Sequence, residues 1–277
     1  MLRRLHLITT AVLFVAATLA AGPRSVSAGP PGNAIFAVDE SGALAPIAVR
    51  AGGTFLAPGS NDGGPSASLA ANALAALAAA GNRVNVVFGG RTIASARATV
   101  HPGQAVIAVP PSLHLGGYVV ALAATSLGGN AKAPRRAPLQ AERRAVLALV
   151  AGKLGTSAQR LTVRNLTAID LGHGSALAGT LNFKGSGAPR VDRRVFVVAE
   201  ATPGGGYRAS LFNAQTITVS EPMLEEAAEY LVDTLQLEDG SQALVTHAIG
   251  YDADTYEIYT RSANGWKNVY GGGGAAM

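Results

Sequence analysis

The stretch that decides the fold runs from Glu229 to Gly274 and reads EYLVDTLQLEDGSQALVTHAIGYDADTYEIYTRSANGWKNVYGGGG. Apolar and polar residues alternate in four short runs, separated by turns rich in Gly, Asn and Asp. Such alternation is typical of antiparallel strands joined in sequence. We therefore expect a four-stranded antiparallel meander, with Leu231, Asp233, Leu235 and Leu237 on one face of its first strand. The stretch predicts an architecture and no reaction.

A weaker copy of this pattern precedes it at an offset of 66 residues. Leu171–Ser175 parallels Leu237–Ser241, and the hairpins that follow these two turns also match. Residues 160–212 and 229–270 are thus expected to form two four-stranded units. Two units are too few for a propeller, which has about four to eight blades. They are expected to pack face to face, or on a helix predicted over 139–154.

Strand and helix patterns also divide the rest of the chain. A hairpin over 34–50, a helix over 69–80 and strands over 83–88, 91–100, 104–109 and 118–125 predict a small α+β unit over 29–125. Residues 126–138, SLGGNAKAPRRAP, lack apolar periodicity and are interpreted as a linker. Residues 139–277 form the C-terminal unit, a duplicated meander with one packing helix. The fold class is mainly β, and α+β overall.

Residues 1–28 have the pattern of a signal peptide. Arg3 and Arg4 precede an apolar run over 7–21, and small residues lie before the expected cleavage after Ala28. A spanning helix needs about 20 apolar residues, and Gly22-Pro23 ends the run early. We therefore expect an exported protein, periplasmic or extracellular, with no membrane span after cleavage. The chain of 277 residues has no Cys, which excludes disulfides and a lipid-anchored cysteine.

This processing is directly testable. Intact-mass spectrometry of the exported protein should find a chain that begins at Gly29. An intact Met1 on a membrane-bound form would contradict the interpretation.

Charge is unevenly distributed along the mature chain. Without the first 28 residues, 19 basic residues face 17 acidic ones. Residues 132–208 carry thirteen Lys and Arg against four Asp and Glu, whereas residues 209–277 carry two against ten. A basic surface for an anionic partner is one interpretation. The other, which we favour, is that both halves belong to one domain and neutralise each other. Stacking aromatics are not interleaved with the arginines, so nucleic-acid binding is not expected.

The strand–turn–strand units with an aromatic hairpin and a Gly tail resemble FG-GAP/VCBS-like repeat units. The chain as a whole resembles a group of secreted bacterial proteins. They share an opening matched here by Val38–Gly42, Pro46-Ile47, Gly52–Phe55 and Pro58, and a later motif matched by Val87–Gly90. The resemblance implies no catalytic residues. Calcium-binding repeats carry alternating Asp oxygens in the turn, which neither turn of this chain keeps, so no metal or other cofactor is expected.

Asp252, Asp254 and Glu257 are the best candidate carboxylate cluster in the C-terminal unit. They could form a metal site or an acid–base pair. The interpretation we favour is that they are solvated acids at the junction of a loop and a strand. His247 shares a strand face with Val245 and is expected to be a hydrogen-bonded core histidine.

Tyr256, Tyr259, Trp266 and Tyr270 concentrate aromatic side chains in one region. Exposed on a sheet, they could bind a glycan or a partner protein. At period-two spacing such residues are more often cross-strand packing pairs, which is the interpretation we favour, and we take Trp266 as packed. H-E-x-x-H, G-x-S-x-G and P-loop motifs do not occur. The favoured function is a non-catalytic binding or structural protein. The alternatives are a hydrolase using Asp252, Asp254 and Glu257, and an anionic-surface binder through residues 135–208.

Overall fold

The computed structural model describes residues 33–56, 67–101, 104–108, 119–122, 127–186, 189–219, 228–249 and 254–272. The expected signal peptide lies outside them. The fold is mainly β, as predicted, with two α-helices among the described residues. None of the helices in these ranges is both long and apolar enough to cross a membrane.

The N-terminal part is a seven-stranded antiparallel sheet in the order β3-β2-β1-β7-β4-β5-β6. A backbone bridge between Ala43 and Val106 brings its last strand back toward β2, which curls the sheet into a half-barrel. Helix α1 (Ala67–Ala79) packs inside the curve against β1 and β2. The strands are β1 (Asn33–Val38), β2 (Leu44–Ala51), β3 (Thr54–Leu56), β4 (Arg83–Phe88), β5 (Arg91–His101), β6 (Gln104–Ile107) and β7 (Val119–Leu122).

Two four-stranded antiparallel meanders follow, in which each strand pairs with the next along the chain. Helix α2 (Gln140–Leu154) and the short 3-10 turn η1 (Ala158–Arg160) precede the first. The first meander contains β8 (Leu161–Asp170), β9 (Ser175–Phe183), β10 (Arg190–Ala201) and β11 (Tyr207–Val219). The second contains β12 (Ala228–Gln236), β13 (Gln242–Ile249), β14 (Asp254–Ser262) and β15 (Gly265–Gly272).

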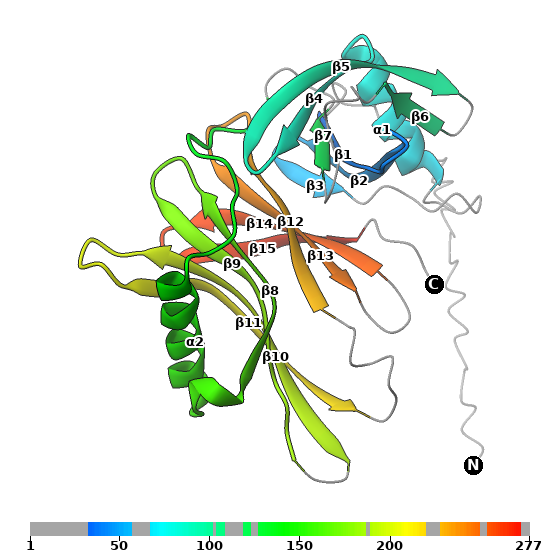
Figure 1. Ribbon diagram of the computed structural model, residues 1–277. Coiled ribbons are helices and arrows are strands. Elements are labelled where there is room, and N and C mark those ends of the chain that lie inside the picture. The colour runs from blue at the N-terminus through cyan, green and yellow to red at the C-terminus, as the bar shows by residue number, and fades with distance from the viewer. Residues whose placement is uncertain are drawn as a thin grey trace, which may run out of the picture.

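These elements stack in layers, which Figure 1 shows from the N-terminal sheet at the top to α2 at the lower left. The two meanders pack face to face through a core that includes Phe196 and Trp266. Helix α2 covers the other face of the first meander. The other face of the second meander packs on the N-terminal sheet. Both expected arrangements are therefore present: the two units pack face to face, and the first unit also packs on the helix.

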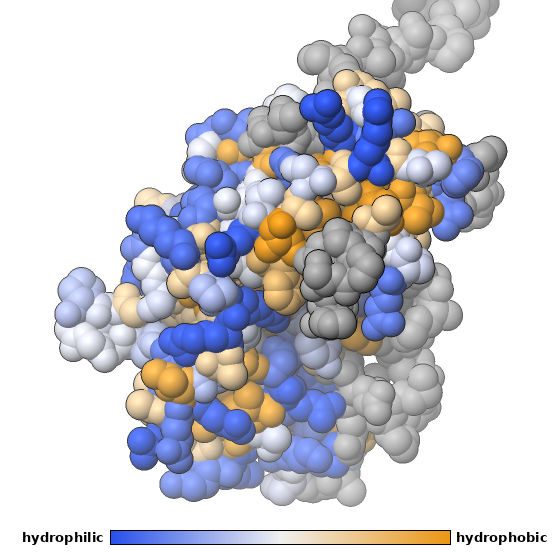
Figure 2. All heavy atoms as spheres, turned by 45° about the horizontal axis from the view of Figure 1, so that its top comes forward, coloured by the Kyte–Doolittle hydropathy of each residue, from blue (hydrophilic) through white to orange (hydrophobic). Residues whose placement is uncertain are grey.

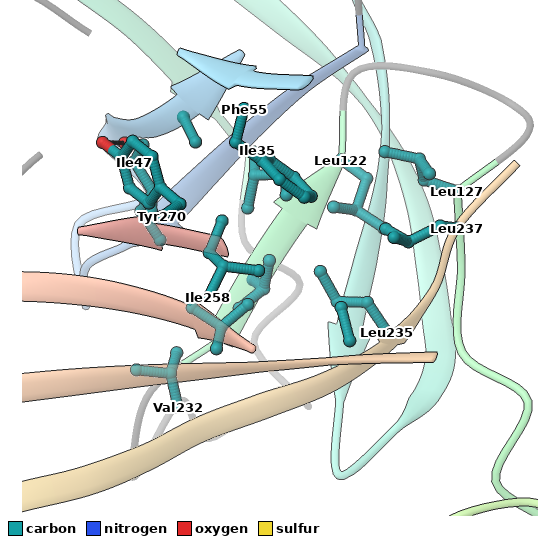
Figure 3. Packing of buried hydrophobic residues seen from close by; sticks show 14 of the residues in the cluster. Ile35, Ile47, Phe55, Leu122, Leu127, Val232, Leu235, Leu237, Ile258 and Tyr270 are labelled. Carbon is teal, nitrogen blue, oxygen red and sulfur yellow. Dashed lines mark hydrogen bonds between the residues drawn. The ribbon is translucent and has the colours of Figure 1, made fainter. Parts of the chain in front are cut away.

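The contact between the N-terminal sheet and the second meander is a continuous apolar layer (Figure 3). Ile35, Ile47 and Leu122 enter it from the N-terminal sheet, and Leu235 and Ile258 enter it from the second meander. All five are fully buried. Removal of this much apolar surface from water is the main force that holds the two parts together.

A β-bulge changes the expected face of residues in strand β12. The register shifts between Leu231 and Asp233. Leu231 therefore points toward the first meander, while Leu235 and Leu237 point toward the N-terminal sheet. One inserted residue reverses the alternation of every later side chain. The sequence-based expectation that these residues share one face is wrong for this reason.

The segment 127–137, within the predicted linker, is hydrogen-bonded to all three sheets. Gly128 and Gln236 exchange two backbone hydrogen bonds, and so do Arg136 and Ala168. The backbone N–H of Ala131 donates to the carbonyl of Gly90, 2.9 Å away. The segment joins the two parts of the chain, and these contacts also fix its path.

The backbone geometry at this junction explains why the motif Val87–Gly90 ends in two glycines. Gly89 and Gly90 have φ of 61° and 73°, which L side chains rarely adopt. A Cβ on Gly90 would also lie 2.3 Å from the Thr234 hydroxyl. The backbone N–H of Gly90 donates to the buried Asp233 carboxylate at 2.6 Å. The turn can approach strand β12 because it has no side chains.

On the face shown in Figure 2, hydrophobic residues gather toward the top and mix with hydrophilic ones below. Among the described residues, three of the six exposed large hydrophobics belong to β3 and β5: Leu56, Ile93 and Val100. Single exposed apolar side chains are ordinary on protein surfaces, and we assign no binding role to them.

Candidate functional site

The three acidic residues grouped by sequence do not lie together as one cluster. Asp254 and Glu257 are three positions apart on β14, so their side chains leave opposite faces of the sheet. Asp254 lies on the face toward the N-terminal sheet, and Glu257 on the face toward the first meander. Asp252 lies outside the described residues. The structure thus does not bring Asp254 and Glu257 to one metal or acid–base centre.

Asp254 instead pairs with His247 of the neighbouring strand. Its carboxylate lies 3.3 Å from His247 Nε2, and the imidazole stacks on Tyr256 with ring centroids 4.6 Å apart. Burial lowers the pKa of His247, and the nearby Asp254 carboxylate opposes that shift. His247 is a buried, hydrogen-bonded histidine, as the sequence suggested.

On the opposite face of β14, Glu257 shares a tyrosine hydroxyl with a second carboxyl group. The Tyr259 hydroxyl is hydrogen-bonded to Glu257 and lies 3.2 Å from Glu229 Oε1. Thr246 donates to the same Glu229 oxygen at 2.9 Å, and Asn213 of the first meander donates to Oε2 at 3.1 Å. This Glu229–Tyr259–Glu257 group lies between the two meanders.

The pKa of Glu229 is raised to about 7. Burial is the main cause, and the charge of Glu257 adds to it, while the donors Thr246, Tyr259 and Asn213 oppose it. One phenol hydrogen cannot satisfy two carboxylates at once, which is a further reason for Glu229 to keep its proton. A perturbed carboxyl beside a second one is a feature that functional sites share with structural networks.

Sequence reasoning missed Glu229, because the carboxylates of 252–257 lie close together along the chain and Glu229 does not. The available signal was the period-two spacing of Glu229 and Leu231. Before the bulge in β12, residues two positions apart share a face, and Leu231 faces the core between the meanders. The register of β12 and β13 then brings Glu229 opposite Ala248 and near Thr246.

The four aromatic residues proposed as a binding surface are packing residues. Tyr259, Trp266 and Tyr270 expose 3%, 8% and 7% of their surfaces. Tyr256 is partly buried against the layer between the second meander and the N-terminal sheet. The possibility of an exposed surface for a glycan or a partner at these positions is therefore wrong, because the side chains pack across strands and between sheets. The expectation that Trp266 is packed is confirmed.

A cavity of about 410 Å³ opens between the segment 127–137 and the β8–β9 turn. Lys132, Pro134 and Arg136 line it from one side, and His173 and Ser175 from the other. The turn of the first unit, between β8 and β9, is thus one wall of an open pocket. We call it the linker pocket.

Among the described residues that line the linker pocket, Asp170 is the one carboxylate, and it holds the two walls together. Its Oδ1 accepts from the Gly172 N–H at 2.7 Å, and its Oδ2 accepts from the Lys132 and Ala133 N–H groups at 2.8 Å each. Burial would raise the pKa of Asp170, but these backbone donors outweigh it and lower the pKa below its usual range. Asp170 is therefore an ionised structural acceptor.

The equivalent turn of the second unit holds its carboxylate in the same manner. Asp239 accepts from the backbone N–H and hydroxyl of Ser241, at 2.9 and 2.5 Å, and from Arg50 at 2.9 Å. These contacts, led by the Ser241 hydroxyl, lower the pKa of Asp239 to about 2. Glu238 and Asp239 of this turn both pair with the Arg50 guanidinium, which already supplies the positive charge between them. Within the described ranges no three His, Cys, Asp or Glu residues are grouped as metal ligands.

Calcium is expected to have little effect on stability. A site of about 10 μM affinity, saturated at 1 mM calcium, would stabilise the fold by about 2.7 kcal/mol. Because the Asp170 and Asp239 oxygens already accept backbone and side-chain donors, the Tm should differ by less than about 2 °C between EDTA and 1 mM calcium. A large rise that Asp239→Ala abolishes would show that the turns bind metal.

Comparison with protein-family models, curated proteins and solved structures finds no match for this chain. Functional inference therefore depends on the geometry of the two places described above. One is the Glu229–Tyr259–Glu257 group, in which Glu229 and Tyr259 are buried and Glu257 is half-buried, and the other is the open linker pocket.

Proposed function

We propose that the protein is an exported, non-catalytic binding protein whose ligand site is the linker pocket. The observation that carries the proposal is the state of Asp170, the only carboxylate among the described residues that line this cavity. Three backbone N–H groups hold both of its oxygens. A general base must be free to take a proton from a substrate, and Asp170 is not. The carboxylate of this pocket therefore serves structure and recognition and not proton transfer.

The resemblance to FG-GAP/VCBS-like units agrees with this proposal, since it implies no catalytic residues. Export is part of the proposal and rests on the pattern of residues 1–28. The ligand itself could be a small molecule or the exposed group of a protein or glycan, because the cavity is open.

A hydrolase is the second candidate, now through Glu229 and Glu257 rather than Asp252, Asp254 and Glu257. The raised pKa of Glu229 favours it, because a carboxyl that titrates near pH 7 can act as an acid. Its burial opposes it: Glu229 and Tyr259 expose 7% and 3% of their surfaces, which leaves little room for a substrate. Catalysis there would require the two meanders to separate.

An anionic-surface binder is less well supported. Several arginines of the basic stretch are paired within the protein, which reduces the charge available to a partner. Arg136 pairs with Glu142 at 2.7 Å, and Arg190 pairs with Asp192 at 3.0 Å. Arg135 lies near the buried Asp233, whose charge acts on it.

Chemical-shift mapping by NMR tests the proposal. The mature chain, starting at Gly29, is titrated with a library of small charged and neutral compounds. Ligands should shift the amides of residues 172–175 and 132–136 and leave those of β14 unchanged. Shifts centred on Glu257 and Tyr259 would instead support the hydrolase, and Glu257→Gln should then abolish turnover. If no compound moves the amides of the linker pocket, the proposal fails.

A further inference from the structure

We propose that the linker pocket binds the oxyanion of a carboxylate or phosphate group. This inference rests on the proposed function and names the chemistry of its ligand. It concerns residues that reach one cavity from two separate segments, Lys132 and Arg136 before α2 and His173 and Ser175 at the β8–β9 turn.

The described lining of the cavity contains two cationic side chains, Lys132 and Arg136, and one carboxylate, Asp170. Arg136 is held by Glu142 through two hydrogen bonds of 2.8 and 2.7 Å, so this pair is close to neutral. The negative charge of Asp170 is stabilised by three backbone donors. The Lys132 side chain interacts electrostatically with the Asp170 carboxylate, but among the described residues it makes no hydrogen bond or ion pair, so its ammonium can still meet an oxyanion. The His173 ring and the Ser175 hydroxyl are likewise exposed at the pocket and can donate hydrogen bonds.

The walls of the pocket are preorganised, which reduces the entropy lost on binding. Asp170 ties the backbone of Lys132 to the β8–β9 turn, and the Arg136–Ala168 backbone pair closes the other end. Gly172 has a φ of 79°, and a Cβ at this position would lie 2.8 Å from the Asn130 side chain. The positive φ is what favours glycine here, since the Asn130 amide could move aside for a Cβ.

Glycine also keeps the turn open toward the ligand. A Cβ on Gly174 would meet no atom within 4 Å, so the backbone at this position faces empty space. A ligand oxyanion can approach the Ser175 hydroxyl and the Lys132 ammonium there. Charge-assisted hydrogen bonds of this kind contribute roughly 1.5–3 kcal/mol each, which corresponds to about a tenfold change in affinity or more.

Isothermal titration calorimetry with the mature chain at low ionic strength provides the test. The probes are inorganic phosphate and succinate, and they separate the two sources of the oxyanion. The wild-type protein should bind at least one of them saturably. Lys132→Ala should weaken binding about tenfold, and Ser175→Asp, which adds a negative charge, should abolish it. Arg144→Ala removes one exposed cation from α2 and should change affinity less than about twofold.

The variants are expected to fold, because Lys132 and Ser175 are exposed, and their Tm values should lie within about 2 °C of wild type. Equal weakening by Lys132→Ala and Arg144→Ala would mean general charge attraction and would overturn the inference. Binding of neutral compounds alone at the linker pocket would overturn it as well, while leaving the proposed function intact. If no compound of any charge shifts the amide signals of this pocket in the NMR titration, both this inference and the proposed function are refuted.

Discussion

Trp266→Ala should lower the free energy of unfolding by about 3–5 kcal/mol, the usual cost of removing a buried large aromatic side chain. Trp266 lies in the core between the two meanders. Its indole N–H donates to Glu200 Oε1 of the first meander at 3.2 Å, and Arg261 lies 5.2 Å from its ring. The substitution would leave a cavity at the inter-sheet contact and remove one donor from a buried carboxylate.

Urea denaturation followed by circular dichroism measures this change. Trp266 is the single tryptophan of the chain, so its fluorescence cannot serve for the variant. Trp266→Phe is the matched control: it keeps an aromatic ring and loses the N–H, and it should cost about 1.5–3 kcal/mol. An unchanged midpoint for Trp266→Ala would show that the side chain is not buried between the meanders.

Glu229→Gln should make the protein more stable at pH 8, by up to about 3 kcal/mol. A carboxyl whose pKa is raised in the folded state, here from 4.5 to about 7, binds more protons folded than unfolded. Its stabilisation is complete below pH 4.5 and is lost as the pH rises through 7. A shift of about 2.5 pKa units corresponds to roughly 3 kcal/mol. Gln keeps the shape of the protonated acid and cannot ionise.

The measurement is the difference in unfolding free energy between variant and wild type from pH 4 to pH 9. The difference should be near zero at pH 4 and grow between pH 5 and pH 8. Asp233, whose pKa burial raises to about 6, adds a similar pH dependence to both proteins and cancels. Glu257→Gln removes the negative charge beside Glu229, which contributes to its raised pKa. In this variant the loss of stability with rising pH should therefore begin at a lower pH than in wild type. A Glu229→Gln variant less stable than wild type at pH 8 would contradict this account.

Much of the fold could be predicted because the local signals agree with the final structure. Alternation with Gly, Asn and Asp turns predicts both meanders, and the hairpin containing Trp266 forms where the Asn264-Gly265 turn places it. The helices begin and end within about two residues of their predicted bounds. The sequence could not show the bulge in β12. The extra residue is defined only by the pairing of β12 with β13, and the two faces of β12 pack on different sheets.

The candidate site was harder to predict because it depends on contacts between distant segments. Asp254 and Glu257 are close in sequence, and a strand sends them to opposite faces. Glu229 meets Glu257 only after the register of β12, β13 and β14 is set. The linker pocket needs Asp170 to capture the backbone of Lys132, 38 residues away. A segment rich in Gly and Pro gives no local pattern that would indicate such a contact.

The central claim is that residues 127–137 are a fixed wall of a binding pocket and not a free tether. Amide hydrogen exchange of the mature chain tests it most directly. The N–H groups of Ala131, Lys132, Ala133 and Arg136, each of which has an acceptor, should exchange at least about a hundredfold more slowly than in an unstructured peptide. Exchange of all four at the unstructured rate would mean that the segment is not held and that the pocket does not exist.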